Sequence, residues 1–176
     1  EGLRGPLIMV SNHKSFGDHF LIFAAMPKRQ RFKLLPVRTM ASDKLYSNFI
    51  KKFFINLLGA YPALKGQGID VSLAKPLEIL KGGGIVGFYP EGVRVRGEGI
   101  GKFKRGIGEL VKRAPGVPVL PIAIRGTQDL ILQILPRPSS RVYVNFGKPF
   151  YPDSKQSGEF ITADIHKNIM DLYSSV

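Results

Sequence analysis

The sequence predicts a single α/β domain with a central mixed, largely parallel sheet flanked by helices. Two observations predict this class. Apolar runs that suit buried strands alternate along the chain with segments of helical periodicity. The 176 residues, 44% of them hydrophobic, suit one compact domain with a sizeable core, and no internal repeat or long linker divides them. We therefore assign residues 1–176 to one domain.

In the first part of the chain, the apolar run PLIMVS predicts a buried strand, and a helix opens near Gly17. Residues 43–59 predict an amphipathic helix with Asp43 as N-cap and Gly59 as its stop. Seven apolar side chains form its stripe: Leu45, Tyr46, Phe49, Ile50, Phe53, Phe54 and Leu57.

The remaining elements follow the same alternation. Residues 70–81 predict a helix that Pro76 interrupts or starts, and the triple glycine after it precedes the strand IVGFY. A loop rich in glycine and cations comes next. It is followed by a short helix at IGELVKR, a buried strand VPVLPIAI, a strand RVYVNF and a C-terminal amphipathic helix over residues 162–173.

The charge balance points to an anionic partner. Lysine and arginine number 26 against 13 acidic residues, which gives a formal net charge of +13. A nucleic acid, an anionic membrane surface and a phosphate-bearing substrate would each suit this charge, and charge alone does not choose among them.

The composition also excludes several classes of site. Cysteine is absent, which removes disulfides, thiolate zinc sites and cysteine nucleophiles. No apolar run approaches the roughly 18 residues of a transmembrane helix, and no signal peptide is present. The chain opens close to its first strand and without methionine, so we expect a preceding segment, which could hold a membrane anchor.

The stretch NHKSFGD places a histidine and an aspartate five positions apart. Spacing alone is weak, because His166 and Asp171 share it in a predicted helix, about 140° apart, as two surface residues. His13 instead follows a strand end and Asp18 opens the next helix, so the loop can bring them together. Two interpretations stay open: a base with its orienting carboxylate, or a loop histidine beside a helix capped by Ser15 or Asp18.

The stretch YPEGVRVRGEGIGKFKRG begins where a buried strand ends, which is where α/β proteins bind ligands. Arg94 offers a planar fork for phosphate oxygens and Lys104 a point charge, while Gly92 and later glycines allow close backbone approach. Glu91 could hold Arg94 or the loop in place. The alternatives are a solvated basic hairpin or a nucleotide loop, but neither GxxxxGK[ST] nor GxGxxG before a helix is present.

Two other segments add little by themselves. LLGAYPALKG puts Lys65 at the end of a short strand, and VPVLPIAIRG has two prolines in an apolar strand, more typical of core than of chemistry. In chain order, however, the four segments resemble the four blocks of the glycerolipid acyltransferase family: NHxxxxD, GxxPxxR, FPEGTRS and a proline-containing strand. The resemblance covers residues 6–126, and the first and third blocks make it specific.

The resemblance implies that His13 is a general base, that Asp18 is its partner, and that Glu91, Gly92 and Arg94 belong to the site for an acceptor phosphate. The sequence departs from the family blocks at Tyr89 for Phe, Val93 for Thr, Val95 for Ser and Lys65 for Arg. Loss of the guanidinium fork at residue 65 affects the identity of the acceptor more than the chemistry.

The activity implied by the resemblance is transfer of a fatty acyl group from acyl-CoA or acyl-carrier protein to the hydroxyl of a lysophospholipid. 1-Acylglycerol-3-phosphate is the first candidate acceptor, and glycerol 3-phosphate or another lyso-lipid are alternatives. The reaction needs a base, a role that suits histidine, and no metal, cofactor or side-chain nucleophile. Asp18, accepting from Nδ1–H, would leave Nε2 basic. Backbone N–H groups after His13, or a nearby cation, could hold the oxyanion.

A membrane partner follows from the lipid acceptor. Residues 28–52 hold one acid, Asp43, and the cations Lys28, Arg29, Arg31, Lys33, Arg38, Lys44, Lys51 and Lys52. Mixed with Phe49, Phe53 and Phe54, these cations suit docking on anionic lipid, although the aromatic residues can equally be core. We expect the protein at the cytoplasmic face of a membrane, peripheral or anchored by a segment outside this chain.

The rival class is a basic nucleic-acid-binding module, which the net charge favours. The sequence has no RNP-like aromatic strand, KH-type GxxG clamp, recognition helix or zinc ligands, so we expect no nucleic-acid partner. A second rival is a family member that binds lipid without turnover, and the intact His13 and Asp18 argue against it.

Overall fold

The computed structural model describes residues 4–31, 33–42, 59–64, 66–127, 130–131, 135–136 and 141–175. Six strands form one sheet: β1 (Leu7–Ser11), β2 (Val37–Ser42), β3 (Ala60–Ala63), β4 (Ile85–Phe88), β5 (Val119–Arg125) and β8 (Tyr143–Phe146). Their order is β3-β2-β4-β1-β5-β8. Neighbours from β3 to β5 pair in parallel, and β8 pairs antiparallel with β5. The mixed, largely parallel sheet is therefore confirmed.

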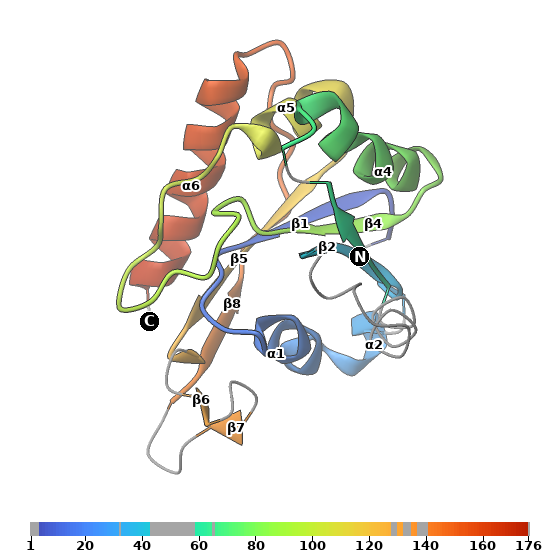
Figure 1. Cartoon of the computed structure of the whole chain (residues 1–176). Coiled ribbons are helices and arrows are strands. Elements are labelled where there is room, and N and C mark those ends of the chain that lie inside the picture. Colours follow the sequence, from blue (N-terminus) through green and yellow to red (C-terminus); the bar gives the residue numbers. More distant parts are fainter. Residues whose placement is uncertain are drawn as a thin grey trace.

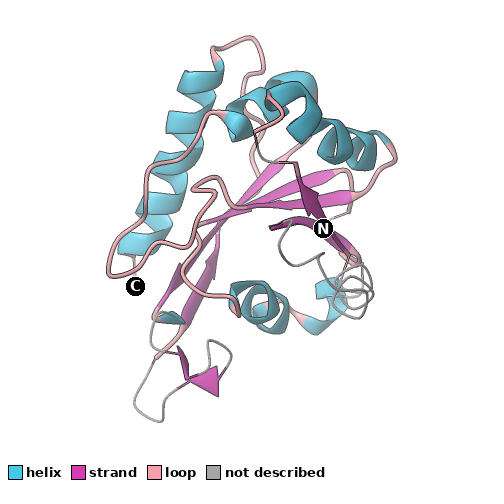
Figure 2. Cartoon of the chain, viewed as in Figure 1, coloured by secondary structure: helices cyan, strands magenta, loops and turns pink. Residues whose placement is uncertain are grey.

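Helices cover both faces of this sheet, as Figures 1 and 2 show. One face carries α4 (Ile69–Lys81), α5 (Gly106–Arg113) and α6 (Gly158–Ser174), and the other carries α1 (Asp18–Ala25) and the short α2 (Lys28–Arg31). A separate two-stranded sheet consists of β6 (Leu130–Ile131) and β7 (Leu135–Pro136). No helix within the described ranges has the length and apolar character needed to cross a bilayer.

Strand β1 explains why the sequence forms a parallel sheet with helices on both sides. All five of its residues are buried, and successive side chains enter opposite layers of the core. Leu7 and Met9 pack with Ile22 of α1, whereas Ile8 and Val10 join the core formed with α4, α5 and α6. A strand buried on both faces must be apolar throughout, as this one is until Ser11.

Several boundaries differ from the sequence-based expectation. Helix α6 begins at Gly158, four residues before the predicted start, because the side chain of Ser157 accepts a hydrogen bond from Phe160 N at 3.1 Å and caps it. Helix α4 runs unbroken through Pro76, which is buried within it. Apolar periodicity did not predict β2, α2, β6 and β7, which are short or lack a clear repeat. The predicted helix over residues 43–59 lies outside the described residues except for Gly59.

Helices α5 and α6 approach so closely that only glycine fits between them. A Cβ atom on Gly108 of α5 would collide with the carbonyl oxygen of Gly158 and lie 2.6 Å from Thr162 Oγ1 on α6. Since backbone atoms cannot move aside as a flexible side chain can, this contact fixes the spacing of the two helices.

We expect Gly108→Ala to lower the free energy of unfolding by about 1–3 kcal/mol through overpacking. This loss should outweigh the gain in helix propensity of up to about 1 kcal/mol. Gly106→Ala is the matched control in the same helix, because its Cβ would meet only Phe88, at 3.7 Å. Denaturant titration of both variants measures the difference, and a Gly108→Ala protein as stable as the control would contradict the packing argument.

Candidate active site

The candidate site lies where two adjacent parallel strands end. Strands β1 and β4 pair in parallel, with Val10 opposite Phe88, and both strands end at the same edge of the sheet. The loop after β1 carries His13, and the loop after β4 carries Glu91. Parallel pairing therefore brings together two segments that are far apart in the sequence, at the position where open α/β sheets bind ligands.

His13 and Asp18 form the predicted pair. The distance between His13 Nδ1 and Asp18 Oδ2 is 2.9 Å, and Asp18 is fully buried. A carboxylate can only accept, so Nδ1 carries the hydrogen, and in the neutral ring the lone pair is then on Nε2. The imidazole side chain retains 24% of its exposure, and no hydrogen bond occupies Nε2 within the described part of the chain. The geometry favours the base over the alternative of a solitary loop histidine.

This geometry arises because the loop after β1 folds around the Asp18 carboxylate. Asp18 Oδ2 also accepts from Lys14 N at 2.6 Å and Ser15 N at 2.9 Å. The expectation that Ser15 or Asp18 caps the helix was wrong, because Gly17 occupies the N-cap position without a side-chain bond. The Asp18 carboxylate instead points back toward the preceding loop, where the backbone amides of Lys14 and Ser15 donate to its Oδ2.

Asn12 anchors the start of the same loop. Its side-chain amide donates to Ile124 O at 2.9 Å, and its Oδ1 accepts from Ile124 N at 2.8 Å. This two-bond clasp fixes the end of β1 against β5 although the residues lie 112 positions apart. Sequence analysis assigned Asn12 no role, and only its place in the NHxxxxD block signalled one.

Tyr89 packs against the face of the imidazole. The two ring centroids are 4.4 Å apart with an interplanar angle of 27°, which is a stacked arrangement. Burial, with a smaller contribution from the nearby Asp18 carboxylate, raises the pKa of the Tyr89 phenol above its ordinary value. Tyr89, which directly follows β4, therefore stays neutral, and its ring packs against one face of the His13 imidazole.

Glu91 holds the two loops together. One carboxylate oxygen accepts from His13 N and the other from Gly101 N, each at 2.8 Å. A backbone bond from Val95 N to His13 O, also 2.8 Å, adds a further tie. Burial raises the pKa of Glu91, while these two amides, Lys14 and His13 act in the opposite direction. Of the two roles considered for Glu91, these contacts support holding the loop; contact with a substrate stays a prediction.

A polar cleft opens beside His13. It has a volume of about 410 Å³ and is lined by His13, Met40, Ala41, Ala63, Gly87, Phe88, Tyr89, Gly92, Val93 and Arg94. Gly92 has a φ of 69°, and a Cβ there would lie 2.9 Å from Lys104 Nζ, so the lysine passes directly over the glycine. The structure thus brings Gly92, Arg94 and Lys104 together near His13. Lys65 lies outside the described residues.

A second cavity, of about 320 Å³, lies on the α1 side of the sheet and is almost entirely apolar. Met9, Ile22, Phe23, Met26, Val37 and Ile122 contribute to its wall. It shares Gly87, Phe88 and Tyr89 with the polar cleft, so the two spaces meet at the residues next to His13.

Two histidines remain outside this pair. His19 of α1 lines the apolar cavity, and burial lowers its pKa, which favours the neutral ring; sequence analysis did not single it out. His166 does not pair with Asp171, which bonds Lys167 instead. The prediction that His166 and Asp171 point to different faces is confirmed; His166 is half-buried, and its ring packs edge-on against Phe103, with centroids 4.6 Å apart. The described residues contain no cluster of three or more potential metal ligands.

Comparison with known proteins identifies the family. The family model named Acyltransferase matches residues 2–125. Chloroplastic 1-acyl-sn-glycerol-3-phosphate acyltransferases of Brassica napus and Arabidopsis thaliana are 28% and 30% identical to this chain over 129 residues. Those residues are 72% of this chain but 35% and 33% of the relatives, so the chain spans about a third of their length.

A solved structure shares the fold. The crystal structure of the 1-acyl-sn-glycerophosphate acyltransferase PlsC from Thermotoga maritima matches with a TM-score of 0.68 and 22% identity, over 98% of this chain and 68% of that one. At this identity the likeness concerns the fold alone. The family model covers well over half of the sequence and includes both loops of the site. The chain therefore belongs to the acyltransferase family.

Proposed function

We propose that this protein transfers a fatty acyl group from the thioester of acyl-CoA or acyl-carrier protein to the free hydroxyl of a lysophospholipid. The first candidate acceptor is 1-acylglycerol-3-phosphate, the substrate in the names of the two plant relatives. The product would then be phosphatidate. Glycerol 3-phosphate and other lyso-lipids are the competing acceptors.

One observation carries this proposal: the polar cleft, which His13 and Arg94 line, shares Gly87, Phe88 and Tyr89 with the apolar cavity, so the two spaces meet close to His13. An acyl chain suits the apolar cavity, because its methylenes leave water there. A phosphate suits the cleft, where Arg94 presents a guanidinium and Lys104 an ammonium close by. The acyl carbonyl and the acceptor hydroxyl would then meet beside Nε2.

In the proposed reaction His13 carries the proton from the acceptor hydroxyl to the leaving thiolate. Nε2 of His13 takes the proton of the acceptor hydroxyl as its oxygen attacks the thioester carbonyl. Asp18 stabilises the imidazolium that forms, through the bond to Nδ1. Collapse of the tetrahedral intermediate breaks the carbon–sulfur bond, and the thiolate leaves with the proton from Nε2. The ester and the free thiol are the products.

The oxyanion needs a hydrogen-bond donor. The hydrogen bonds that the backbone amides already make reduce the number of candidates. The backbone amides of His13, Lys14 and Ser15 already donate to Glu91 or Asp18. These three amides are therefore already engaged, and we propose a cation of the cleft, the other kind of donor expected from the sequence, for the oxyanion.

Replacing the base should abolish turnover. We expect His13→Ala to lower kcat/KM for acyl transfer by about 10²–10⁴-fold, because it removes general-base catalysis. Asp18→Asn should leave a reduced remainder, since it alters the orienting group and keeps the imidazole. Thiol release from an acyl thioester, followed with lysophosphatidate present, measures both. His166→Ala is the control and should change nothing, and near-normal activity of His13→Ala would rule out the mechanism.

Arg94 should contribute to binding more than to chemistry. A phosphate that keeps its charge through the reaction contacts Arg94 equally in the ground and transition states, so Arg94→Ala should mainly raise the acceptor KM. A charge-assisted bond of about 1.5–3 kcal/mol predicts a loss of roughly 10- to 150-fold in kcat/KM. Arg94→Lys should recover part of it. A fall confined to kcat would place Arg94 at the oxyanion, and a raised donor KM would assign the cleft to the donor.

We also propose that the α1 side of the protein docks on anionic lipid at the cytoplasmic face of a membrane. Phe20 and Leu35, at the rim of the apolar cavity, expose 43% and 48% of their surface, and Phe16 exposes 49%. Helix α2, which follows α1, supplies Lys28, Arg29 and Arg31. Apolar side chains beside cations suit an interface with anionic lipid, and an acceptor or acyl chain would enter from that side.

Liposome sedimentation tests this orientation. The protein should bind vesicles that contain phosphatidylglycerol and leave them as salt rises, because exposed charges are screened within about 10 Å at 0.1 M. Replacing Lys28 and Arg29 by Ala should weaken binding by roughly 10- to 30-fold, at about 1 kcal/mol for each cation.

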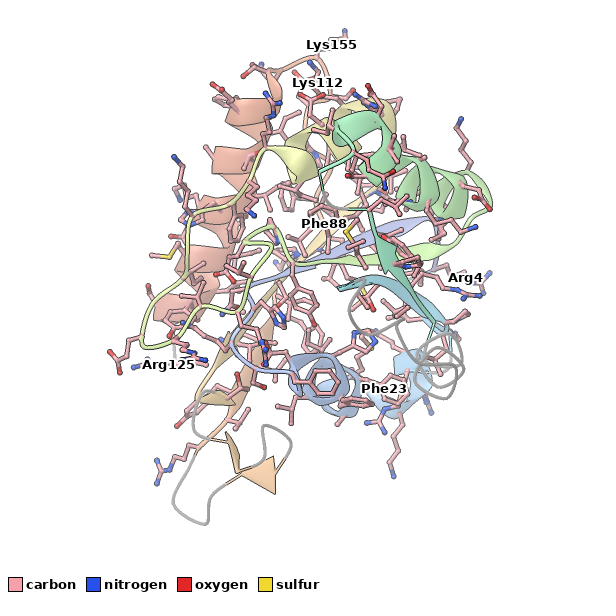
Figure 3. All side chains as sticks on the ribbon, viewed as in Figure 1. Arg4, Phe23, Phe88, Lys112, Arg125 and Lys155 are labelled. Carbon is pink, nitrogen blue, oxygen red and sulfur yellow. The ribbon has the colours of Figure 1, made fainter. Side chains whose placement is uncertain are left out.

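The matched control replaces Lys81 and Lys112 by Ala, which removes the same charge from the α4–α5 side. Lys112 lies across the sheet from Phe23 of α1 (Figure 3). Equal losses in the two double variants, or equal binding to neutral vesicles, would contradict the proposed docking side.

A further inference from the structure

The loop that carries Arg94 needs something to hold it. Residues 91–101 follow β4 and contain Gly92, Gly97, Gly99 and Gly101, and most of these residues are exposed or half-buried. Glu91 fixes the two ends of this glycine loop through His13 N and Gly101 N. Its middle contains no helix or strand, so contacts with other parts of the protein must set its shape.

A buried lysine supplies those contacts. Lys14 follows His13 in the loop after β1 and exposes only 4% of its surface. Its Nζ donates to Gly97 O at 2.9 Å and also to Gly99 O. The two glycines have φ of 83° and 79°, a left-handed conformation that other residues rarely adopt. The carbonyls that accept from Lys14 thus belong to residues whose backbone conformation suits glycine.

The last helix completes the arrangement. Tyr173 of α6 accepts a hydrogen bond from Gly99 N at 3.2 Å through its hydroxyl. Its ring centroid lies 6.0 Å from Lys14 Nζ and 5.7 Å from Arg125 Cζ. The glycine loop runs alongside α6 in Figure 1. One residue of the loop, Gly99, is therefore held through its carbonyl by Lys14 and through its amide by Tyr173.

The burial of Lys14 has a cost that its packing does not explain. Desolvation lowers the pKa of Lys14, and the charges of Glu91, Asp18 and Glu98 oppose that shift. An apolar side chain of similar length would fill the space without placing an ammonium group there. The contacts that such a side chain could not make are those with the two loop carbonyls.

We infer that Lys14 and Tyr173 are positioning residues that hold the glycine loop in the conformation in which Arg94 faces the acceptor. The identity of the acceptor in this inference rests on the proposed function, whereas the contacts of Lys14 and Tyr173 with the glycine loop do not. Without the two side chains the loop samples other conformations, and the acceptor must order it on binding. The acceptor KM then rises, while kcat for bound substrate stays close to its original value.

The catalytic pair should survive these changes. Asp18 accepts from the backbone amide of Lys14, which a substitution of the side chain leaves in place. His13 keeps its bonds to Asp18 and Glu91 for the same reason. The separation of KM from kcat is therefore the property that distinguishes a positioning role from a general loss of structure.

The test uses Lys14→Met, Tyr173→Phe and the control Lys75→Met, which removes an exposed lysine that pairs with Glu78 on α4. Lysophosphatidate is titrated at saturating acyl thioester. We expect Lys14→Met to raise the acceptor KM by roughly 10- to 100-fold and Tyr173→Phe by roughly 2- to 10-fold, with kcat of Tyr173→Phe, which removes no charge, within about twofold. Lys14→Arg should restore part of the affinity, and the control should match the wild type.

A second readout needs no turnover. Trypsin cuts after Arg94 and Arg96, so a loosened loop should be cleaved faster in Lys14→Met and Tyr173→Phe than in Lys75→Met. If the wild type fails to acylate lysophosphatidate, the proposed function fails, and the cleavage rates still test the loop contacts. If Lys14→Met does not fold, Tyr173→Phe carries both measurements. Unchanged cleavage, or a fall in kcat at constant KM, would overturn the inference.

Discussion

One carboxylate oxygen, Asp18 Oδ2, organises the chemistry of this protein. It accepts from His13 Nδ1 and from the amides of Lys14 and Ser15, so a single atom fixes the path of the loop and the tautomer of His13. Full burial keeps water from competing for these bonds. The amides of Lys14 and Ser15 are thereby engaged, so neither is available to donate to a bound substrate.

The site is built around buried charges that compensate one another. Asp18 and Glu91 are buried acids, Lys14 is a buried cation, and each is bonded to the loops between which it lies. Buried charges of this kind contribute little to the stability of a fold compared with apolar packing. Their value here is geometric, because they join the ends of β1 and β4 to a glycine loop that has no regular structure. The polar cleft and the apolar cavity then meet at Gly87, Phe88 and Tyr89.

The sequence predicted those parts that depend on local patterns. The strand before His13, the strand before Glu91 and the helices α4 and α5 follow from apolar periodicity. The spacing left the pairing of His13 with Asp18 open, and the resemblance of NHKSFGD to the NHxxxxD block favoured it. The bonds of Asn12 to Ile124 and of Lys14 to Gly97 join residues 112 and 83 positions apart. No local pattern encodes such partners. The start of α6 was misplaced because a Ser cap outweighed the apolar repeat.

The most direct test of this account is the tautomer of His13, observed through the nitrogen-15 shifts of its imidazole in the neutral ring. We expect a protonated Nδ1 and an unprotonated Nε2 in the wild type, with both tautomers populated in Asp18→Asn. A neutral ring protonated at Nε2 in the wild type would contradict the account, because the nitrogen beside the cleft could not then take a proton from the acceptor.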